Sequence, residues 1–226
     1  TTSPLLRQEL LLAGCSEENV HVLPCCLSVE QENAALMLQV NKPRSSQTLC
    51  VLFIGRLDSY KRLDWLFQAL VALSNSWHLV VVGDGPKRIF FEKLSSKLIG
   101  ANSDDRVTFC GRLSEAAKLE QLALADVLVL PSDRSNEAFG IVQLEAMAAA
   151  MPSLAFDLPR SGMGWVGQLP SLQWSQSQDG LADVLQRLSE DSELLCQASS
   201  QSRDRYQRLF ARKVWRQHLN SFGFLQ

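Results

Sequence analysis

The feature that most constrains the fold is a regular alternation of short apolar runs with helical patterns after residue 48. The apolar runs are Leu49–Ile54, His78–Val82, Arg106–Phe109, Asp126–Leu130 and Pro152–Phe156. Each is continuously apolar, which is typical of parallel strands that helices cover on both faces. The helical patterns between them are Leu63–Leu73, Pro86–Leu98, Ser114–Leu124 and Gly140–Ala150. Short links favour right-handed βαβ units, so the sequence predicts an α/β fold with an open parallel sheet and helices on both faces.

Outside this alternation the patterns are weaker. Ahead of it we expect a helix, a strand, a second helix and a polar link, at Leu5–Leu12, Val20–Leu23, Val29–Val40 and Asn41–Thr48. After it we expect a short strand and two helices, at Ser171–Trp174, Leu181–Leu188 and Glu193–Leu219.

Composition and charge exclude several classes of protein. The net charge of −2 gives no general attraction to nucleic acid, so we expect no nucleic-acid partner. No apolar run is long enough to span a bilayer, and no signal-peptide pattern is present. The 6 cysteines show no CxxC spacing, so no metal site is expected. These features predict a cytoplasmic protein.

Two glutamates flank the start of the last helical pattern of the alternation. Glu145 falls in an otherwise apolar helix, where an unpaired carboxylate is costly and therefore indicates a partner or a ligand. Glu137 precedes that helix, and the free N–H groups of a helix start attract anions. Carboxylates on either side of an anion site suit a ligand with hydroxyl groups at both ends and phosphate in the middle. A nucleotide sugar has this layout.

Basic residues and glycines gather where the expected strands end, and ligands of open α/β sheets bind at that edge. Lys61 and Arg62 fall at a helix start, where cations oppose the helix dipole. A bound pyrophosphate would explain both cations, although each alone is also compatible with a solvated surface. A second basic run, Arg203–Arg216, is interpreted as a solvated helix face, with an anionic membrane surface as the alternative.

Several of these motifs occur together in a recognisable order. They are Gly55-Arg56-Leu57, Lys61, Gly83-Asp84-Gly85-Pro86, Arg106-Val107, Pro131-Ser132, Glu137-x-Phe139-Gly140 and Glu145-Ala146-Met147-Ala148. Their order and spacing, with a Glu-x7-Glu signature, closely resemble the C-terminal domain of GT-B glycosyltransferases of the GT4 family. The resemblance covers about residues 49–190 and is greatest to bacterial enzymes that build O-antigen or capsule polysaccharide.

The resemblance implies a Rossmann-like fold and a role for each motif residue. Arg56 and Lys61 would hold the donor diphosphate and stabilise the leaving nucleotide. Glu137 would contact hydroxyls of the donor sugar, and Glu145 would accept both ribose hydroxyls. The other expected nucleotide-sugar-binding positions are Gly55, Gly83, Leu113, Lys118, Ala138, Phe139, Gly140 and Ile141, with Leu113 and Lys118 beside the base.

The resemblance also implies a reaction and a domain plan. A hexose would be transferred from a UDP-sugar or GDP-sugar to a growing polysaccharide or lipid-linked glycan. The transfer would retain the anomeric configuration of the sugar and would need no metal ion. Residues 1–45 would end an N-terminal domain and form the linker, 46–200 would bind the nucleotide sugar, and 201–226 would form a return helix. The N-terminal GT-B domain would be missing, so this chain alone is expected to be inactive. Peripheral contact with the cytoplasmic face of the inner membrane is left open.

Some features depart from the family pattern. Ala150 stands where a glycine usually follows the helix, and Ala138 stands where glycine is frequent. The apolar side of the return helix, with Tyr206, Phe210, Val214 and Trp215, would be exposed or packed in an oligomer. Two other functions stay open: a noncatalytic module that binds sugar nucleotides, and a Rossmann-type NAD oxidoreductase domain. The incomplete glycine motif at Gly83-Asp84-Gly85 argues against the second.

Overall fold

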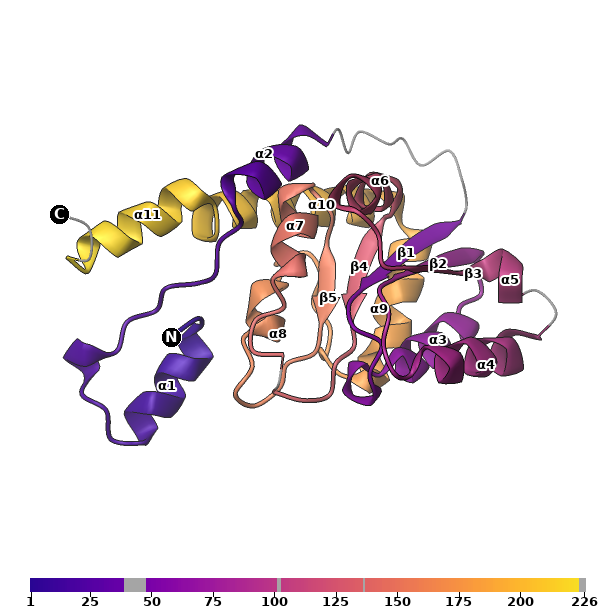
Figure 1. The fold of residues 1–226 in the computed structure, drawn as a ribbon, viewed down its shortest axis with the longest axis horizontal. Helices are drawn as coiled ribbons and strands as arrows, with labels where there is room; N and C mark the ends of the chain where they lie inside the picture. Colours follow the sequence, from indigo (N-terminus) through magenta and orange to yellow (C-terminus); the bar gives the residue numbers. More distant parts are fainter. Residues whose placement is uncertain (39–47, 101–102, 136, 224–226) are drawn as a thin grey trace.

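The computed structural model describes residues 1–38, 48–100, 103–135 and 137–223. Within these ranges the strands form one parallel sheet in the order β3-β2-β1-β4-β5 (Figure 1). The strands are β1 (Leu49–Ile54), β2 (Trp77–Val82), β3 (Val107–Gly111), β4 (Val127–Leu130) and β5 (Ser153–Ala155). Each falls on a predicted apolar run, so the open parallel sheet is confirmed.

Helices connect consecutive strands and continue after the sheet. In the core they are α3 (Leu63–Val71), α4 (Arg88–Ile99), α5 (Ser103–Arg106), α6 (Glu115–Leu124), α7 (Val142–Ala148) and α8 (Met163–Val166). The flanking helices are α1 (Pro4–Leu12), α2 (Val29–Met37), α9 (Gln178–Glu190), α10 (Ser192–Leu209) and α11 (Arg212–Ser221). Short 3-10 turns lie at Glu17–Asn19 and Ser59–Lys61. Ser114 caps α6, as its position before an acidic residue predicts.

Consecutive residues of one strand point to opposite faces of the sheet, which explains the continuous apolar runs. In β1, Val51 and Phe53 pack with residues of α3, α4 and α9. Leu52, between them, packs in a second cluster with residues of α6, α7 and α8. Both faces of the sheet are therefore covered by helices, as expected.

A third apolar cluster corrects the prediction for the return helix. Tyr206 and Phe210 are fully buried, and they pack with Phe139 and with Leu27 of the N-terminal segment. The prediction is therefore wrong for Tyr206 and Phe210, which are covered within the chain, whereas Val214 and Trp215 of α11 are half-buried. The expected continuous helix from Glu193 is also interrupted between α10 and α11. At the break, Phe210 is buried and packs against Trp165 and Phe139.

Two predicted strands are not strands in the structure. Val20–Leu23 forms no strand ladder in the described residues. Its hydrogen bonds are with Thr1, with the Glu17 carbonyl and with the Arg7 side chain. Ser171 ends a turn and residues 172–174 have no regular structure, and the Gln173 carbonyl accepts from the Arg187 side chain at 2.9 Å. The polar link that follows α2 lies mostly outside the described residues.

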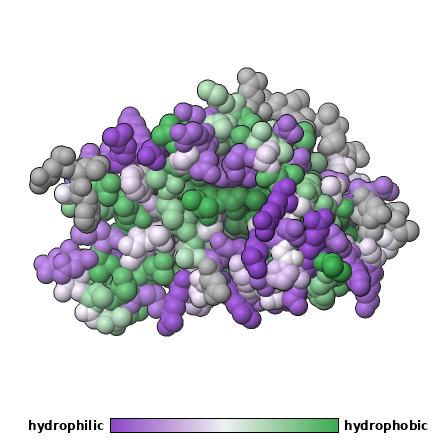
Figure 2. Space-filling view, in the orientation of Figure 1, coloured by the Kyte–Doolittle hydropathy of each residue, from purple (hydrophilic) through white to green (hydrophobic). Residues whose placement is uncertain are grey.

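The N-terminal and C-terminal helices extend from one side of the sheet. Figure 1 shows α1 at the lower left, apart from the sheet, with α11 above it. A stacked pair, His21 and Phe222, joins the two regions with ring centroids 4.6 Å apart. Figure 2 shows apolar surface over α1, where Leu10 and Leu12 are exposed. In the described ranges no helix is both long enough and apolar enough to cross a membrane.

Candidate functional site

The turns that follow β1 and β2 are in backbone contact at the carboxyl edge of the sheet. The Leu57 amide donates to the Asp84 carbonyl at 3.0 Å. A Cβ on Gly83 would lie 1.9 Å from the Gly55 carbonyl oxygen, and a Cβ on Gly85 would lie 2.3 Å from the Leu57 carbonyl oxygen. Glycine is therefore required at 83 and 85 because the two turns touch through their backbones.

Lys61 pairs with Glu137 at this edge. The Lys61 ammonium forms an ion pair with Glu137 Oε2, which joins the turn after β1 to the loop after β4. Lys61 is buried, with 6% of its surface exposed, and its Nζ lies 3.7 Å from where a Cβ on Gly55 would be. Burial lowers the pKa of Lys61 to about 8. The structure thus brings together two of the predicted catalytic residues.

Buried polar side chains hold the segment between Glu137 and α7. Ser161 Oγ donates to the Glu137 carbonyl at 2.6 Å, and the Gly162 amide donates to the Ala138 carbonyl at 2.7 Å. The fully buried Gln143 donates to the Phe139 carbonyl at 3.1 Å. Sequence analysis did not identify Ser161 or Gln143 as site residues. The polar Gln143 in an apolar helix was a usable signal, like that of Glu145.

Gly140 also shapes this segment. Its φ of +68° lies in the left-handed region, and an added Cβ would come within 3.0 Å of Gln143 Nε2. Beside it, Phe139 is buried and Ile141 is exposed. Helix α7 starts at Val142, later than predicted. The expected contacts of the Phe139, Gly140 and Ile141 amides with a ligand remain predictions.

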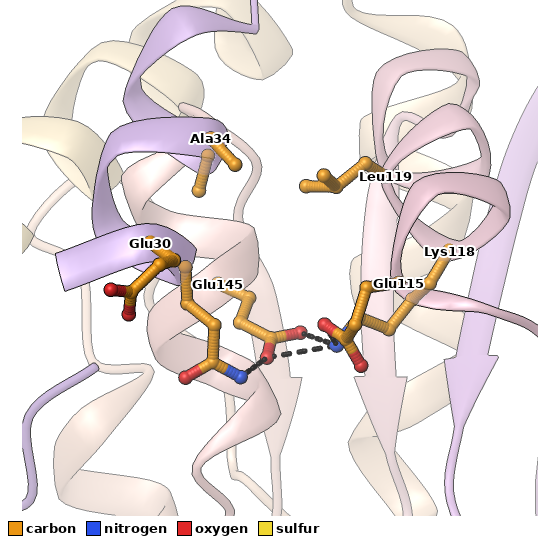
Figure 3. A pocket seen from close by; sticks show the side chains of 8 residues that line it. Glu30, Ala34, Glu115, Lys118, Leu119 and Glu145 are labelled. Carbon is orange, nitrogen blue, oxygen red and sulfur yellow. Dashed lines mark hydrogen bonds and ion pairs between the residues drawn. The ribbon is translucent and has the colours of Figure 1, made fainter. Parts of the chain in front are cut away.

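Glu145 has its partners on two other helices. Lys118 Nζ of α6 lies 3.0 Å from Oε1 and 2.9 Å from Oε2 of Glu145. Gln31 Nε2 of α2 donates to the same Oε1 at 3.1 Å (Figure 3). Burial raises the pKa of Glu145, and the contact with Lys118 opposes that shift. The predicted buried carboxylate with a partner is confirmed, and that partner is Lys118.

A cavity of about 170 Å³ opens beside this pair, between α2 and α6. Its lining residues are Glu30, Gln31, Ala34, Ala35, Glu115, Lys118, Leu119 and Glu145. Figure 3 shows Ala34 and Leu119 facing each other across it, with the charged groups of Glu145 and Lys118 at one end. Sequence analysis missed the contribution of α2, because no local pattern links Gln31 to a residue 114 positions away.

Other predicted residues lie apart from these two pairs. The Arg56 side chain is 62% exposed, and its described ion pair is with Asp58 at 3.5 Å. Leu113 does not line the cavity and packs against the second apolar cluster. Lys61 and Glu137 do not line the cavity either.

The C-terminal basic run is not simply a solvated face, as the sequence suggested. Arg205 donates to the carbonyls of Val166 and Trp165, and Arg212 donates to the carbonyl of Leu27. Arg203 likewise donates to a carbonyl at the end of α2. These arginines fasten α10 and α11 to the rest of the chain, because backbone carbonyls in those positions need donors.

The profile described as "Glycosyl transferases group 1" matches residues 48–191, which is more than half of the chain. The chain belongs to this family. The predicted family is therefore confirmed, and the NAD oxidoreductase alternative is set aside. The segment of this chain that matches the family contains both ion pairs, Lys61–Glu137 and Lys118–Glu145, but it does not contain α2.

Curated members of the family are similar over part of their length. An alpha-D-kanosaminyltransferase of Streptomyces kanamyceticus is 33% identical over 153 residues, 64% of this chain and 37% of that protein. A lipopolysaccharide 1,6-galactosyltransferase of Escherichia coli is 26% identical over 154 residues, 67% of this chain and 40% of that protein. The chain therefore spans well under half the length of these relatives.

Solved structures of glycosyltransferases share the fold. The apo form of WaaB, a lipopolysaccharide outer core galactosyltransferase, has a TM-score of 0.74 at 21% identity, covering 96% of this chain and 59% of that one. The Anabaena protein HepE in complex with UDP has a TM-score of 0.75 at 18% identity, covering 96% and 60%. These likenesses show that the chain has the Rossmann-like fold of a GT-B domain.

Proposed function

We propose that this chain is the donor-binding domain of a retaining glycosyltransferase that takes a hexose from a UDP-sugar or GDP-sugar. The acceptor would be a growing polysaccharide or a lipid-linked glycan, and the reaction would take place in the cytoplasm or at the inner face of the inner membrane. The observation that carries the proposal is the buried Glu145, held by Lys118 at the end of an apolar-walled cavity. Family membership supports the reaction class.

The cavity fits the nucleoside part of such a donor. Glu145 can accept hydrogen bonds from two adjacent ribose hydroxyls, because an ionised carboxylate has acceptor sites on both oxygens. Ala34 and Leu119 form apolar walls on opposite sides of a gap, which suits a flat base. Burial raises the pKa of Glu145, and Lys118 at 2.9 Å opposes that rise and so favours the ionised carboxylate.

The carboxyl edge of the sheet fits the diphosphate and the sugar. Arg56 and Lys61 would stabilise the negative charge that develops on the leaving diphosphate when the bond to the anomeric carbon breaks. Glu137, which is paired with Lys61, would accept from hydroxyls of the sugar. The new bond would form to an acceptor hydroxyl supplied by another domain, so we expect no transfer by this chain alone.

A metal-free reaction belongs to the same proposal. The two basic side chains would do the work of charge neutralisation that a divalent cation does in other transferases. In the described part of the chain, no group of three or more His, Cys, Asp or Glu side chains is arranged to hold a metal ion. Addition of EDTA should leave nucleotide affinity unchanged.

Calorimetric titration with UDP, GDP and their hexose conjugates tests the proposal. Glu145→Ala should weaken binding at least tenfold, since hydrogen bonds to a charged acceptor contribute about 1.5–3 kcal/mol. Lys61→Ala should weaken the binding of the nucleoside diphosphates by a similar factor. Glu120→Ala, an exposed position on α6, is the matched control and should bind like the wild type. Unchanged affinity in both site variants would refute the proposed site.

A noncatalytic binding module remains the second candidate, because the cavity beside Glu145 accounts for nucleotide binding and not for transfer. Both candidates predict the same nucleotide affinity. They differ when the longer protein is assayed with donor and acceptor glycans: release of UDP or GDP that depends on the acceptor supports the transferase.

A further inference from the structure

Arg62 follows Lys61 directly and has a strained backbone. Its φ of 46° and ψ of 42° place it in the left-handed region, at the residue that precedes α3. A side chain is disfavoured in this conformation, which glycine adopts freely. Strain of this kind persists where surrounding contacts impose it, and it is frequent near functional sites.

The Arg62 side chain is partly exposed, at 26%, and its guanidinium is held by two carboxylates. Its guanidinium donates to both oxygens of Asp64, at 3.0 and 2.8 Å, and to Asp133 Oδ2 at 3.0 Å. It also lies 3.5 Å from the ring centroid of Trp65. The two carboxylates raise the pKa of Arg62, mainly through the hydrogen bonds to Asp64. In the described residues Arg62 is therefore an ion-paired side chain and not a freely solvated one, and the phosphate contact stays the alternative to be tested.

Asp133 connects Arg62 to the other half of the candidate site. It lies in the loop after β4, four residues before Glu137. Its backbone amide donates to the Tyr60 carbonyl at 2.9 Å, on the other side of Lys61 from Arg62. The segment that carries Lys61 is thus fastened to the loop that carries Glu137 at two points, one before and one after Lys61.

We propose that Arg62 is a positioning residue. It holds Lys61 and Glu137 in their paired positions because it links the turn after β1 to the loop after β4. This inference rests on the proposed function, since the pair it positions would hold the diphosphate and the sugar. The planar fork of arginine can bond two carboxylates at once, which the ammonium of lysine cannot do with the same geometry. The strained backbone is retained because it aims the fork at Asp133.

Three variants separate positioning from a direct phosphate contact. Arg62→Gly removes the fork and relieves the backbone strain, Arg62→Lys keeps the charge and loses the fork, and Asp133→Asn removes the carboxylate that the fork holds. All three should weaken UDP-hexose or GDP-hexose binding about five- to tenfold, while affinity for the nucleoside monophosphate stays within about twofold of the wild type. Arg187→Ala, an arginine of α9, is the control.

A direct phosphate contact predicts a different pattern. Arg62→Lys would then keep most of the affinity, and Asp133→Asn would strengthen binding by removing a competing carboxylate. Either result would overturn the proposal. An equal loss for the monophosphate and the hexose conjugate would also overturn it, because that loss would reflect general unfolding.

Hydrogen exchange without any nucleotide tests the tie itself. The Asp133 amide should exchange several-fold faster in Arg62→Gly than in the wild type, whereas its exchange in Arg187→Ala should be unchanged. Unchanged exchange in Arg62→Gly would show that no tie exists. If the wild type bound no nucleotide but the exchange rate rose as expected, the proposed function would fail while the structural tie would stand.

Discussion

At the scale of single residues, Gln31 shows how the site is prepared for a ligand. Its amide nitrogen donates to Glu145 Oε1, where a ribose hydroxyl would donate, and its amide oxygen accepts from the Ser28 amide at the start of α2. A bound ribose would have to displace this amide. One side chain therefore connects the occupancy of Glu145 with the N-terminal cap of α2.

Replacing Gln31 should therefore strengthen nucleotide binding. We expect Gln31→Ala to raise the affinity for UDP or GDP about threefold, within the range of one hydrogen bond's net contribution, because the ligand no longer competes with the amide. Calorimetry measures this directly. Ser28→Ala is the control, since it removes the other half of the cap without touching Glu145. Weaker binding by Gln31→Ala would mean that Gln31 orients Glu145 instead.

Lys61 gives nucleotide binding a pH dependence. With its pKa lowered to about 8 by burial, it loses its charge near that pH. Affinity for a diphosphate should be nearly constant below about pH 7, fall about twofold by pH 8 and fall about tenfold by pH 9. Lys61→Arg should flatten the profile. The sign for stability is opposite: the unfolded state binds more protons between the folded and unfolded pKa values, so this residue's contribution to stability rises with pH there.

Ala150 carries a strain that glycine would remove. Its φ of 57° is in the left-handed region just after α7, where sequence analysis noted a missing glycine. Ala150→Gly should raise the free energy of unfolding by about 1 kcal/mol in urea titrations. Ala149→Gly, at a φ of −82°, is the control and should lower it, since glycine there adds freedom to the unfolded chain and removes a buried methyl group. Equal effects of the two changes would contradict this explanation.

At the scale of elements, α2 is held in place by the C-terminal helices. Tyr206 of α10 donates its hydroxyl to Glu32 Oε1 at 2.9 Å, and the Arg212 amide donates to the same oxygen at 2.9 Å. Burial raises the pKa of Tyr206 well above its usual value, so the hydroxyl remains a donor. These bonds fix one wall of the cavity.

Loss of the Tyr206 hydroxyl should loosen that wall. Tyr206→Phe should lower the free energy of unfolding by about 1–2 kcal/mol, because the Glu32 carboxylate loses a buried donor. Tyr60→Phe removes a hydroxyl from a less buried ring and serves as the control. Urea titration of both variants gives the comparison, and an equal small effect would show that the hydroxyl bond does not hold α2.

The elements differ in how far the sequence predicted them. The strands were found because burial on both faces makes a run apolar throughout, and this signal is local. The supposed strands at Val20–Leu23 and Ser171–Trp174 were wrong because a strand needs a partner, which no short window reveals. The burial of Glu145 predicted that it has a partner, although not which residue that partner is. Gln31 could not, since only tertiary packing brings α2 to the site.

At the scale of the whole molecule, the candidate site is built from parts inside and outside the family match. Both ion pairs lie within residues 48–191, whereas α2 and the helices that hold it lie on either side. The expected boundary at residue 200 falls inside α10, which packs against α7 beside the site. The flanks are thus structural supports of the cavity, and the predicted division into 1–45, 46–200 and 201–226 remains to be tested by expression of the separate parts.

A crystal structure of this chain with a UDP-hexose or GDP-hexose tests the central claim most directly. We predict the ribose hydroxyls on Glu145, with Gln31 displaced, the base between α2 and α6, and the diphosphate extending to Lys61. A nucleotide bound elsewhere, or one in this cleft whose ribose does not contact Glu145, would contradict the proposed function.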